Sequence, residues 1–201
     1  MSEELEKTGG EAPEEQSEKE GLAGSLYYWL QALVVALAVL IVVFTFFGRI
    51  IGVVGHSMDN TLNNGEILIL QSIGYTPKQG DIIVLNKYTS PVLEGKAIVK
   101  RCIAVGGQTV RIDYDAGTVS VDGQVLDEPY IPEPMHDPIY VNSNMSISEV
   151  TVPEGHIFVM GDNRNNSTDS RHVQVGVVDE RFVLGRALVV VFPLNKFELL
   201  V

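Results

Sequence analysis

Residues 26–47 read LYYWLQALVVALAVLIVVFTFF, a run without a single charged side chain. A helix of this length is roughly 33 Å long at 1.5 Å per residue, enough to span a hydrocarbon core of about 30 Å. Soon after it comes Gly55-His56-Ser57-Met58-Asp59, where a serine stands among small and turn-forming residues. The sequence therefore predicts a transmembrane helix that holds Ser57 near a bilayer surface, a position suited to chemistry on something that is itself in the membrane.

The alternative is a secretory signal peptide, which has an apolar region of 7–15 residues and a small-residue cleavage site. This run is longer, lies behind an acidic tail and ends in phenylalanines, so a retained anchor over residues 25–48 is favoured. Tyr27, Tyr28 and Trp29 would form an interfacial belt at its entry. Lysines precede the span and Arg49 follows it, a slight bias that puts the N-terminus in the cytoplasm and the domain outside.

The composition limits the partners and the tail. The net charge of −12 and the lack of a basic cluster argue against nucleic acid as a partner. Eight Glu and two Lys fall within the first twenty residues, so residues 1–24 are expected to be a disordered, acidic tail. The single cysteine, Cys102, rules out an intrachain disulfide.

Beyond the span, the hydrophobic period changes from helical to two, which is typical of strands. No convincing second helix appears, so residues 49–201 are expected to be one mainly antiparallel β domain. Asp122-Gly123 predicts a β-hairpin, and residues 127–150, rich in Pro, Asn and Ser, predict an irregular excursion. We expect strands at 66–70, 81–85, 97–105, 109–113, 118–121, 157–160 and 184–192.

A serine needs a base to become a nucleophile, and histidine is the usual one. His56 is adjacent to Ser57, so in an extended segment the two side chains point opposite ways. His136, His156 and His172 lie in loop-like stretches, and their positions alone leave them open as bases.

A buried lysine is the other kind of base, because desolvation lowers the pKa of its amine. Lys100 fits this requirement best, since it interrupts an apolar strand. A lysine in a strand can also simply face solvent. Arg101 must face the opposite way, so one of the two cations points inward or along a cleft.

Residues 161–171, GDNRNNSTDSR, put many hydrogen-bonding side chains into one short loop. Taken alone, such a pattern favours a self-bonded structural turn. It lacks the ligand spacing and the bidentate Glu of a calcium loop, so neither a metal nor a cofactor is predicted.

These segments together resemble type I signal peptidases, the bacterial leader peptidase family, in a Gram-positive-like form. The likeness covers about residues 26–192. It rests on the order of the membrane span, Ser57–Leu62, Gly80–Val84, Lys100-Arg101 and Gly161–Arg171.

The resemblance implies an all-β catalytic domain on one N-terminal anchor, a serine endopeptidase that removes N-terminal signal peptides from exported preproteins. It implies Ser57 as nucleophile, Lys100 as general base and Ser167 as the residue that orients the lysine amine. Asp169 and Arg171 would form a supporting ion pair. It implies no cofactor, and its partners would be signal peptides, membrane lipid and the secretory translocon at the cell membrane.

Two positions depart from the family pattern. Asn60 stands where the family usually has proline, so the turn after Ser57 loses a constraint on φ. Gly55 stands where some members carry a serine hydroxyl as an oxyanion donor. The oxyanion hole is then expected to use backbone N–H groups, that of Ser57 with one from Gly55 or its neighbour.

The small residues that precede a signal-peptide cut would match a shallow apolar pocket. Each candidate could equally be an ordinary core residue. By position in the sequence, the candidates are Val53, Met58, Leu62, Ile98 and Val99.

Two other classes are weighed against this hypothesis. A cell-surface cysteine transpeptidase also has an anchor and a β domain, but Cys102 has no motif around it. A membrane-tethered binding module without activity is disfavoured by the intact Ser57, Lys100 and Ser167.

Overall fold

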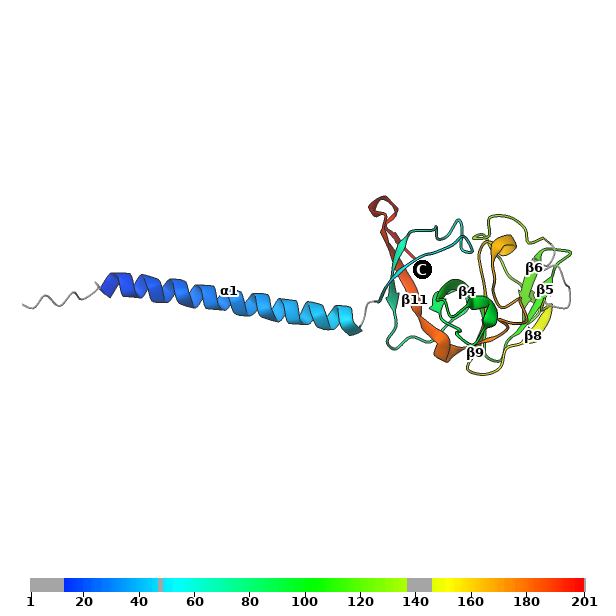
Figure 1. The fold of residues 1–201 in the computed structure, drawn as a ribbon, viewed down its shortest axis with the longest axis horizontal. Helices are drawn as coiled ribbons and strands as arrows, with labels where there is room; N and C mark the ends of the chain where they lie inside the picture. Colours follow the sequence, from blue (N-terminus) through cyan, green and yellow to red (C-terminus); the bar gives the residue numbers. More distant parts are fainter. Residues whose placement is uncertain (1–12, 47–48, 137–145, 201) are drawn as a thin grey trace, which may run out of the picture. The chain divides into compact units, whose positions relative to one another are not determined.

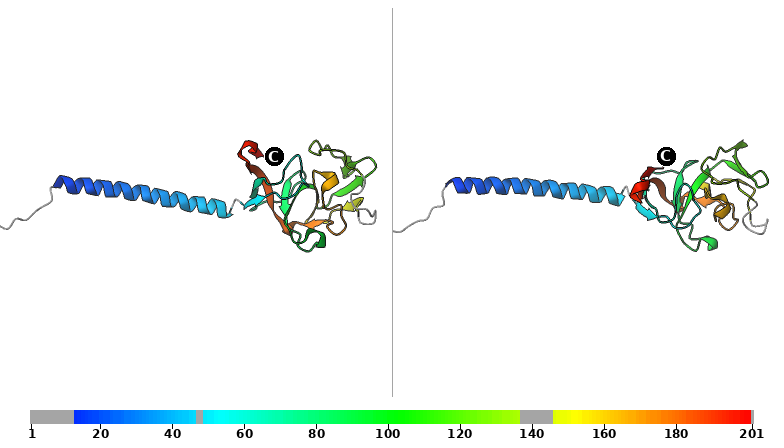
Figure 2. Two further views of the ribbon diagram at one scale, coloured as in Figure 1. Left: turned by 45° about the horizontal axis from the view of Figure 1, so that its top comes forward. Right: turned by 90° about the horizontal axis from the view of Figure 1, so that it is seen from above.

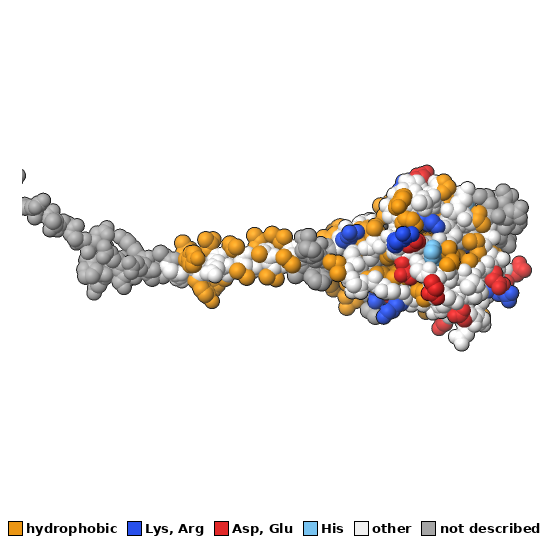
Figure 3. All heavy atoms as spheres, turned by 90° about the horizontal axis from the view of Figure 1, so that it is seen from below, with side chains coloured by type: hydrophobic (Ala, Val, Ile, Leu, Met, Phe, Trp, Pro, Cys, Tyr) orange, Lys and Arg blue, Asp and Glu red, His pale blue; other side chains and the backbone are white. Residues whose placement is uncertain are grey.

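The computed structural model describes residues 13–46, 49–136 and 146–200, which fall into a helical unit up to Thr45 and a second unit from Phe46 onward (Figure 1). In the first, α1 (Pro13–Phe46) begins inside residues 1–24, for which disorder was expected; residues 1–12 lie outside the described part. Its stretch Gly24–Val42 is long and apolar enough to cross a membrane. Hydrophobic side chains cover that stretch in Figure 3, and an all-round apolar helix with no protein partner is typical of a membrane span.

The second unit is mainly β, as the alternating pattern predicts. Its strands are drawn as arrows in the two views of Figure 2. The larger sheet runs in the order β1-β2-β11-β3-β4-β9-β10, with β12 paired to β11, and every pairing is antiparallel. The strands are β1 (Arg49–Gly52), β2 (Ile67–Gln71), β3 (Ile82–Leu85), β4 (Ile98–Val105), β9 (His156–Met160), β10 (Val178–Asp179), β11 (Val183–Phe192) and β12 (Glu198–Leu199).

A second sheet of four strands packs beside it in the order β7-β6-β5-β8. Its strands are β5 (Thr109–Asp113), β6 (Thr118–Val121), β7 (Gln124–Val125) and β8 (Glu149–Thr151). The expected hairpin is confirmed, since β6 and β7 pair across Asp122-Gly123. β8 starts at Glu149, at the end of the stretch 127–150 that was expected to be irregular, and residues 137–145 are outside the described part.

The core has three parts that follow from the period of two in the strands. On β3, Ile82 and Val84 pack into the cluster under β2 and β11, whereas Ile83 and Leu85 pack into the cluster beside β9 and β10. A third cluster fills the space between β4, β9 and the small sheet. β3 reads as a continuous apolar run because both of its faces are covered.

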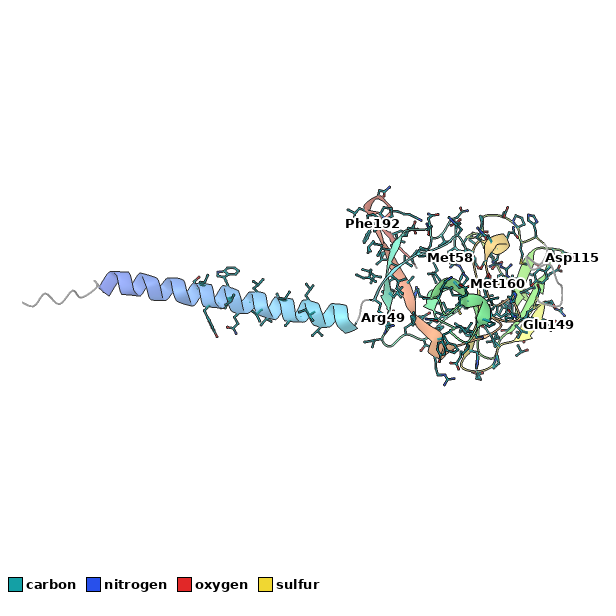
Figure 4. The ribbon with its side chains drawn as sticks, viewed as in Figure 1. Arg49, Met58, Asp115, Glu149, Met160 and Phe192 are labelled. Carbon is teal, nitrogen blue, oxygen red and sulfur yellow. The ribbon has the colours of Figure 1, made fainter. Side chains whose placement is uncertain are left out.

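Four short 3-10 turns lie in the described parts of the chain, and two of them, η1 and η3, border the site. They are η1 (Pro91–Leu93), η3 (Arg164–Asn166), η4 (Glu180–Phe182) and η5 (Leu194–Lys196). In Figure 4, Arg49 and Phe192 lie at one end of this unit, Asp115 and Glu149 at the other, and Met58 and Met160 between them.

Candidate active site

The loop that carries Ser57 is fixed by its backbone and by two buried anchors. Val53 N–H donates to Glu66 O at 2.8 Å, and Leu62 N–H donates to Met58 O at 2.8 Å, which closes one turn. The Met58 and Leu62 side chains are fully buried in the core beneath the turn. Ser57 thus sits on a short turn whose apolar residues face inward.

Asn60 has a φ of +69°, in the left-handed region that asparagine tolerates. Proline is locked near −65°, so it could not take this conformation. Proline in place of Asn60 would therefore require a different backbone at this turn.

Lys100 reaches Ser57 from β4, where it pairs with Ile83 of β3. Its Nζ lies 2.6 Å from Ser57 Oγ and 3.0 Å from Val99 O. Only 3% of the residue is exposed, and this burial lowers the pKa of its amine to about 8. The nearby Asp169 acts in the opposite direction and Arg171 in the same direction, and burial outweighs both.

The buried side chain of Asp169 organises residues 161–171, called the polar loop below. Its carboxylate accepts from Arg171 Nε and Nη2 at 2.8 Å each, from Ser167 Oγ at 2.6 Å and from Gly161 N at 3.0 Å. Burial by itself raises the pKa of Asp169, but Arg171 and these hydrogen bonds bring it below its ordinary value. The loop is thus self-bonded, as its composition predicts, and it also packs against the Ser57 turn.

A second ion pair, Arg101–Asp162, links β4, the Ser57 turn and the polar loop. Arg101 faces away from Lys100, as expected, and makes a two-pronged contact with Asp162 at 2.8 and 2.7 Å. Asp162 also accepts from Thr61 Oγ1 at 2.5 Å, and Asn163 N donates to Ser57 O at 3.1 Å. The polar loop therefore holds both the Ser57 turn and the strand of Lys100. The sequence alone gives no role to Arg101, Thr61 or Asp162, because these contacts span long sequence separations.

A cavity of about 270 Å³ opens beside Ser57 and Lys100. Its apolar lining is Val54, Val92, Leu93 and Ile98, with Glu94 and Lys96 also on its wall. Of the residues expected in a pocket, Ile98 lines this cavity and Val99 is half-buried against the core. Val53, Met58 and Leu62 are buried core residues beneath it.

The other candidate groups have contacts away from Ser57 Oγ. Gly55 N–H donates to Asn64 Oδ1 at 3.0 Å, so that bond must break before Gly55 can donate to an oxyanion. His56 Nδ1 lies 3.1 Å from Asp59 Oδ2, and His156 Nδ1 lies 3.0 Å from Glu154 O.

His136 and His172 also have contacts of their own. The His136 backbone N–H donates to Asn165 Oδ1, and His172 Nδ1 accepts from Gln174 N–H. Cys102 is fully buried, and burial raises the pKa of its thiol to about 12, which leaves little thiolate for a transpeptidase.

Comparison with known proteins places most of the chain in one family. Residues 26–192 match the model of the family described as signal peptidase, peptidase S26. Signal peptidase I of Bacillus licheniformis is 34% identical over 179 residues, covering 87% of this chain and 92% of the relative. Probable signal peptidase I-1 of a Synechocystis species is 40% identical over 148 residues, covering 70% and 69%. The crystal structure of a signal peptidase I from Enterococcus faecalis is 33% identical and covers 56% of this chain and 97% of its own, with a TM-score of 0.42.

Gly161 lies where the polar loop packs tightly against Ser57 and Ser167. A Cβ built on it would overlap Ser167 Oγ and the Ser57 carbonyl oxygen. We expect Gly161→Ala to displace the Ser57 turn and to lower kcat on the order of 100-fold, as misplacements of about 1 Å do. Steady-state kinetics on a purified preprotein measure it. Gly52→Ala is the matched control, because a Cβ there meets nothing within 4 Å. Wild-type kcat in Gly161→Ala would contradict this close packing.

Proposed function

This chain belongs to the signal peptidase family, peptidase S26, and we propose that it cuts with Ser57 as nucleophile and Lys100 as general base. The resemblance drawn from the motifs is thereby confirmed: the chain is a serine endopeptidase whose family removes signal peptides. The observation that carries the assignment of the two residues is the 2.6 Å separation of Lys100 Nζ and Ser57 Oγ on a lysine that is almost fully buried.

The proposed proton path needs only these two side chains. With the amine neutral, the Ser57 hydroxyl donates to Lys100 Nζ, within the 2.6–3.2 Å reach of a general base. Ser57 Oγ attacks the scissile carbonyl while its proton moves to the amine. The resulting ammonium gives that proton to the leaving peptide nitrogen, and the neutral amine then activates the water that hydrolyses the acyl-enzyme.

Ser167, Asp169 and Arg171 would support this pair rather than react. Asp169 accepts from both Ser167 and Arg171, so the loop that packs on the Ser57 turn is held by a buried ion pair. In this proposal Ser167 keeps the lysine amine directed toward Ser57. The oxyanion hole would use the Ser57 N–H together with a neighbouring N–H, that of Gly55 once released from Asn64.

The substrate would enter the cavity beside Ser57. Ile98, Val54, Val92 and Leu93 give it an apolar wall, which suits the small side chains that precede a signal-peptide cut. Val53, Met58, Leu62 and Val99 would act through the core, by setting the floor under the Ser57 turn.

Membrane lipid is a proposed partner of the catalytic unit as well as of α1. Register aligns Ile50, Ile69, Val189 and Leu199 across β1, β2, β11 and β12, so their side chains share the outer sheet face. Ile50 is 61% and Leu199 66% exposed, and the exposed Phe192, Leu194 and Phe197 continue the apolar surface. A sheet with apolar residues on both faces has both faces covered, so the outer face of these strands is expected to contact lipid.

We further propose a single-pass protein with a cytoplasmic N-terminus and an extracytoplasmic catalytic unit. Its support is the apolar α1 segment and the slight excess of lysine before it. The secretory translocon would deliver the substrate to the outer surface. Protease protection in sealed membranes tests the topology, and a catalytic unit accessible only from the cytoplasmic side would contradict it.

The proposed dyad predicts loss of activity for two substitutions, each for its own reason. Ser57→Ala is expected to abolish cleavage of a model preprotein with little change in the melting temperature, because only a hydroxyl is lost. Lys100→Arg is expected to be inactive too, since guanidinium does not give up its proton in proteins. His56→Ala is the control and should keep most of the activity. An active Lys100→Arg enzyme would rule out lysine as the base.

The pH dependence follows from the same amine. Since Lys100 must be deprotonated to act as a base, kcat/KM should rise with pH and level off above the lowered pKa of about 8. Rates measured from pH 6 to 10 in detergent give the midpoint. A midpoint near the ordinary histidine value that disappears in His56→Ala would assign the base to histidine instead.

The apolar outer face predicts a difference between membrane-embedded and soluble substrates. Phe197→Asp and Leu199→Asp are expected to slow cleavage of a preprotein in liposomes several-fold and to leave cleavage of a short peptide in detergent unchanged. Val125→Asp is the matched control, because Val125 is 65% exposed on β7 of the other sheet. Equal rates in liposomes for all three variants would show that this face does not contact lipid during catalysis.

A further inference from the structure

Residues 127–136 cross the polar loop as a strap, and their contacts concentrate on that loop. Glu128 makes a two-pronged ion pair with Arg164, whose side chain is fully buried. Asn165 donates to Glu133 Oε1 at 2.8 Å and accepts from the His136 backbone N–H at 2.9 Å. The irregular excursion therefore packs on the loop that supports the Ser57 turn.

Tyr130 is the residue of the strap that also reaches β4. The Arg101 guanidinium lies over its ring, with Arg101 Cζ 3.9 Å from the ring centroid. Its hydroxyl donates to Glu128 Oε1 at 2.8 Å. A guanidinium held over an aromatic face is attracted by the ring, most strongly where water is excluded, and only 11% of the Arg101 side chain is exposed. Tyr130 thus joins the Arg164–Glu128 pair to the Arg101–Asp162 pair.

The second of those pairs leads directly to the reacting atoms. Arg101 follows Lys100 in the chain, so fixing its side chain fixes the end of β4 that carries the lysine. Asp162 holds Thr61 at 2.5 Å in the Ser57 turn. Arg101 Nη1 also donates to Gly80 O at 2.9 Å, so all three guanidinium nitrogens make a hydrogen bond. Both members of the dyad are therefore placed by the position of one guanidinium.

We propose that Tyr130 is a positioning residue for signal-peptide cleavage: its ring fixes Arg101, which through Asp162 and Thr61 sets the distance between Ser57 and Lys100. This inference rests on the proposed function of Ser57 and Lys100. Tyr130 acts by its π face and not by touching substrate, since the cavity beside Ser57 is lined by other residues. Tyr130, the residue of the strap that reaches β4, thereby affects the rate of cleavage.

The test compares side chains that keep or lose the π face in the full-length protein. Tyr130→Phe keeps the ring and should retain most of kcat. Tyr130→Leu loses it and should lower kcat on the order of tenfold or more, with KM nearly unchanged, at a temperature well below melting. If Tyr130→Leu does not fold, Tyr130→Met gives the comparison, because it fills a similar volume without a ring. Equal kcat in the ring-bearing and ringless variants would overturn the proposal.

Tyr75→Leu is the matched control for loss of a half-buried tyrosine. Tyr75 also donates to a carboxylate, Asp81 at 2.8 Å, but its ring does not lie over Arg101. It should lower the melting temperature and leave kcat near the wild-type value. A fall in kcat as large as that of Tyr130→Leu would mean that general destabilisation, rather than positioning, explains the loss.

A double-mutant cycle tests the route. Thr61→Val removes the hydroxyl that Asp162 holds, so Tyr130→Leu should cost much less kcat in that background than in wild type. Fully additive losses would overturn the route through Thr61. The proposed function fails separately: cleavage by Ser57→Ala would refute the nucleophile, whereas a silent Tyr130→Leu beside an inactive Ser57→Ala refutes only the positioning role.

Discussion

The desolvation of one amine is the constraint on which the site depends. A lysine in water is almost entirely protonated at neutral pH and cannot act as a base, whereas burial of Lys100 on β4 lowers its pKa to about 8 and so gives a larger fraction of neutral amine. The surroundings must be dry enough to favour the neutral amine, yet polar enough to hold it 2.6 Å from Ser57. Asp169 and Arg171 meet this requirement together, because a nearby carboxylate alone would favour the ammonium and the guanidinium offsets it.

Such a lysine needs rigid neighbours, and the fold supplies them from distant parts of the sequence. The Ser57 turn rests on Met58 and Leu62 in the core under β2 and β11. The polar loop follows β9, which pairs directly with β4. Each ion pair in this region is buried and hydrogen-bonded on more than one side, the condition under which buried charges are tolerated in a protein interior. Pairing and burial thus make the geometry of the dyad a property of the whole catalytic unit.

The sequence predicts the elements better than their contacts. The alternation of apolar and polar residues locates the β strands. The order of the motifs identifies Ser57, Lys100 and the polar loop as candidates for the site. Pocket and core could not be separated in this way, because Val53, Met58 and Leu62 have the same apolar character as Ile98. Tyr130 and Glu128 lie in a stretch without hydrophobic period, so only the three-dimensional structure relates them to Arg101 and Arg164. The start of α1 at Pro13 has a local signal, proline in the first turn followed by Glu14 and Glu15, but the low hydrophobicity of residues 1–24 predicts disorder instead.

The most direct test of this account is the titration of Lys100 itself. Nuclear magnetic resonance of the full-length chain with isotope-labelled lysine, assigned by the resonance that Lys100→Arg removes, gives the pKa of this amine in the folded protein. The account predicts a midpoint of about 8. A midpoint at the ordinary lysine value near 10.5 would mean that burial leaves almost no neutral amine at neutral pH, and would contradict Lys100 as the base.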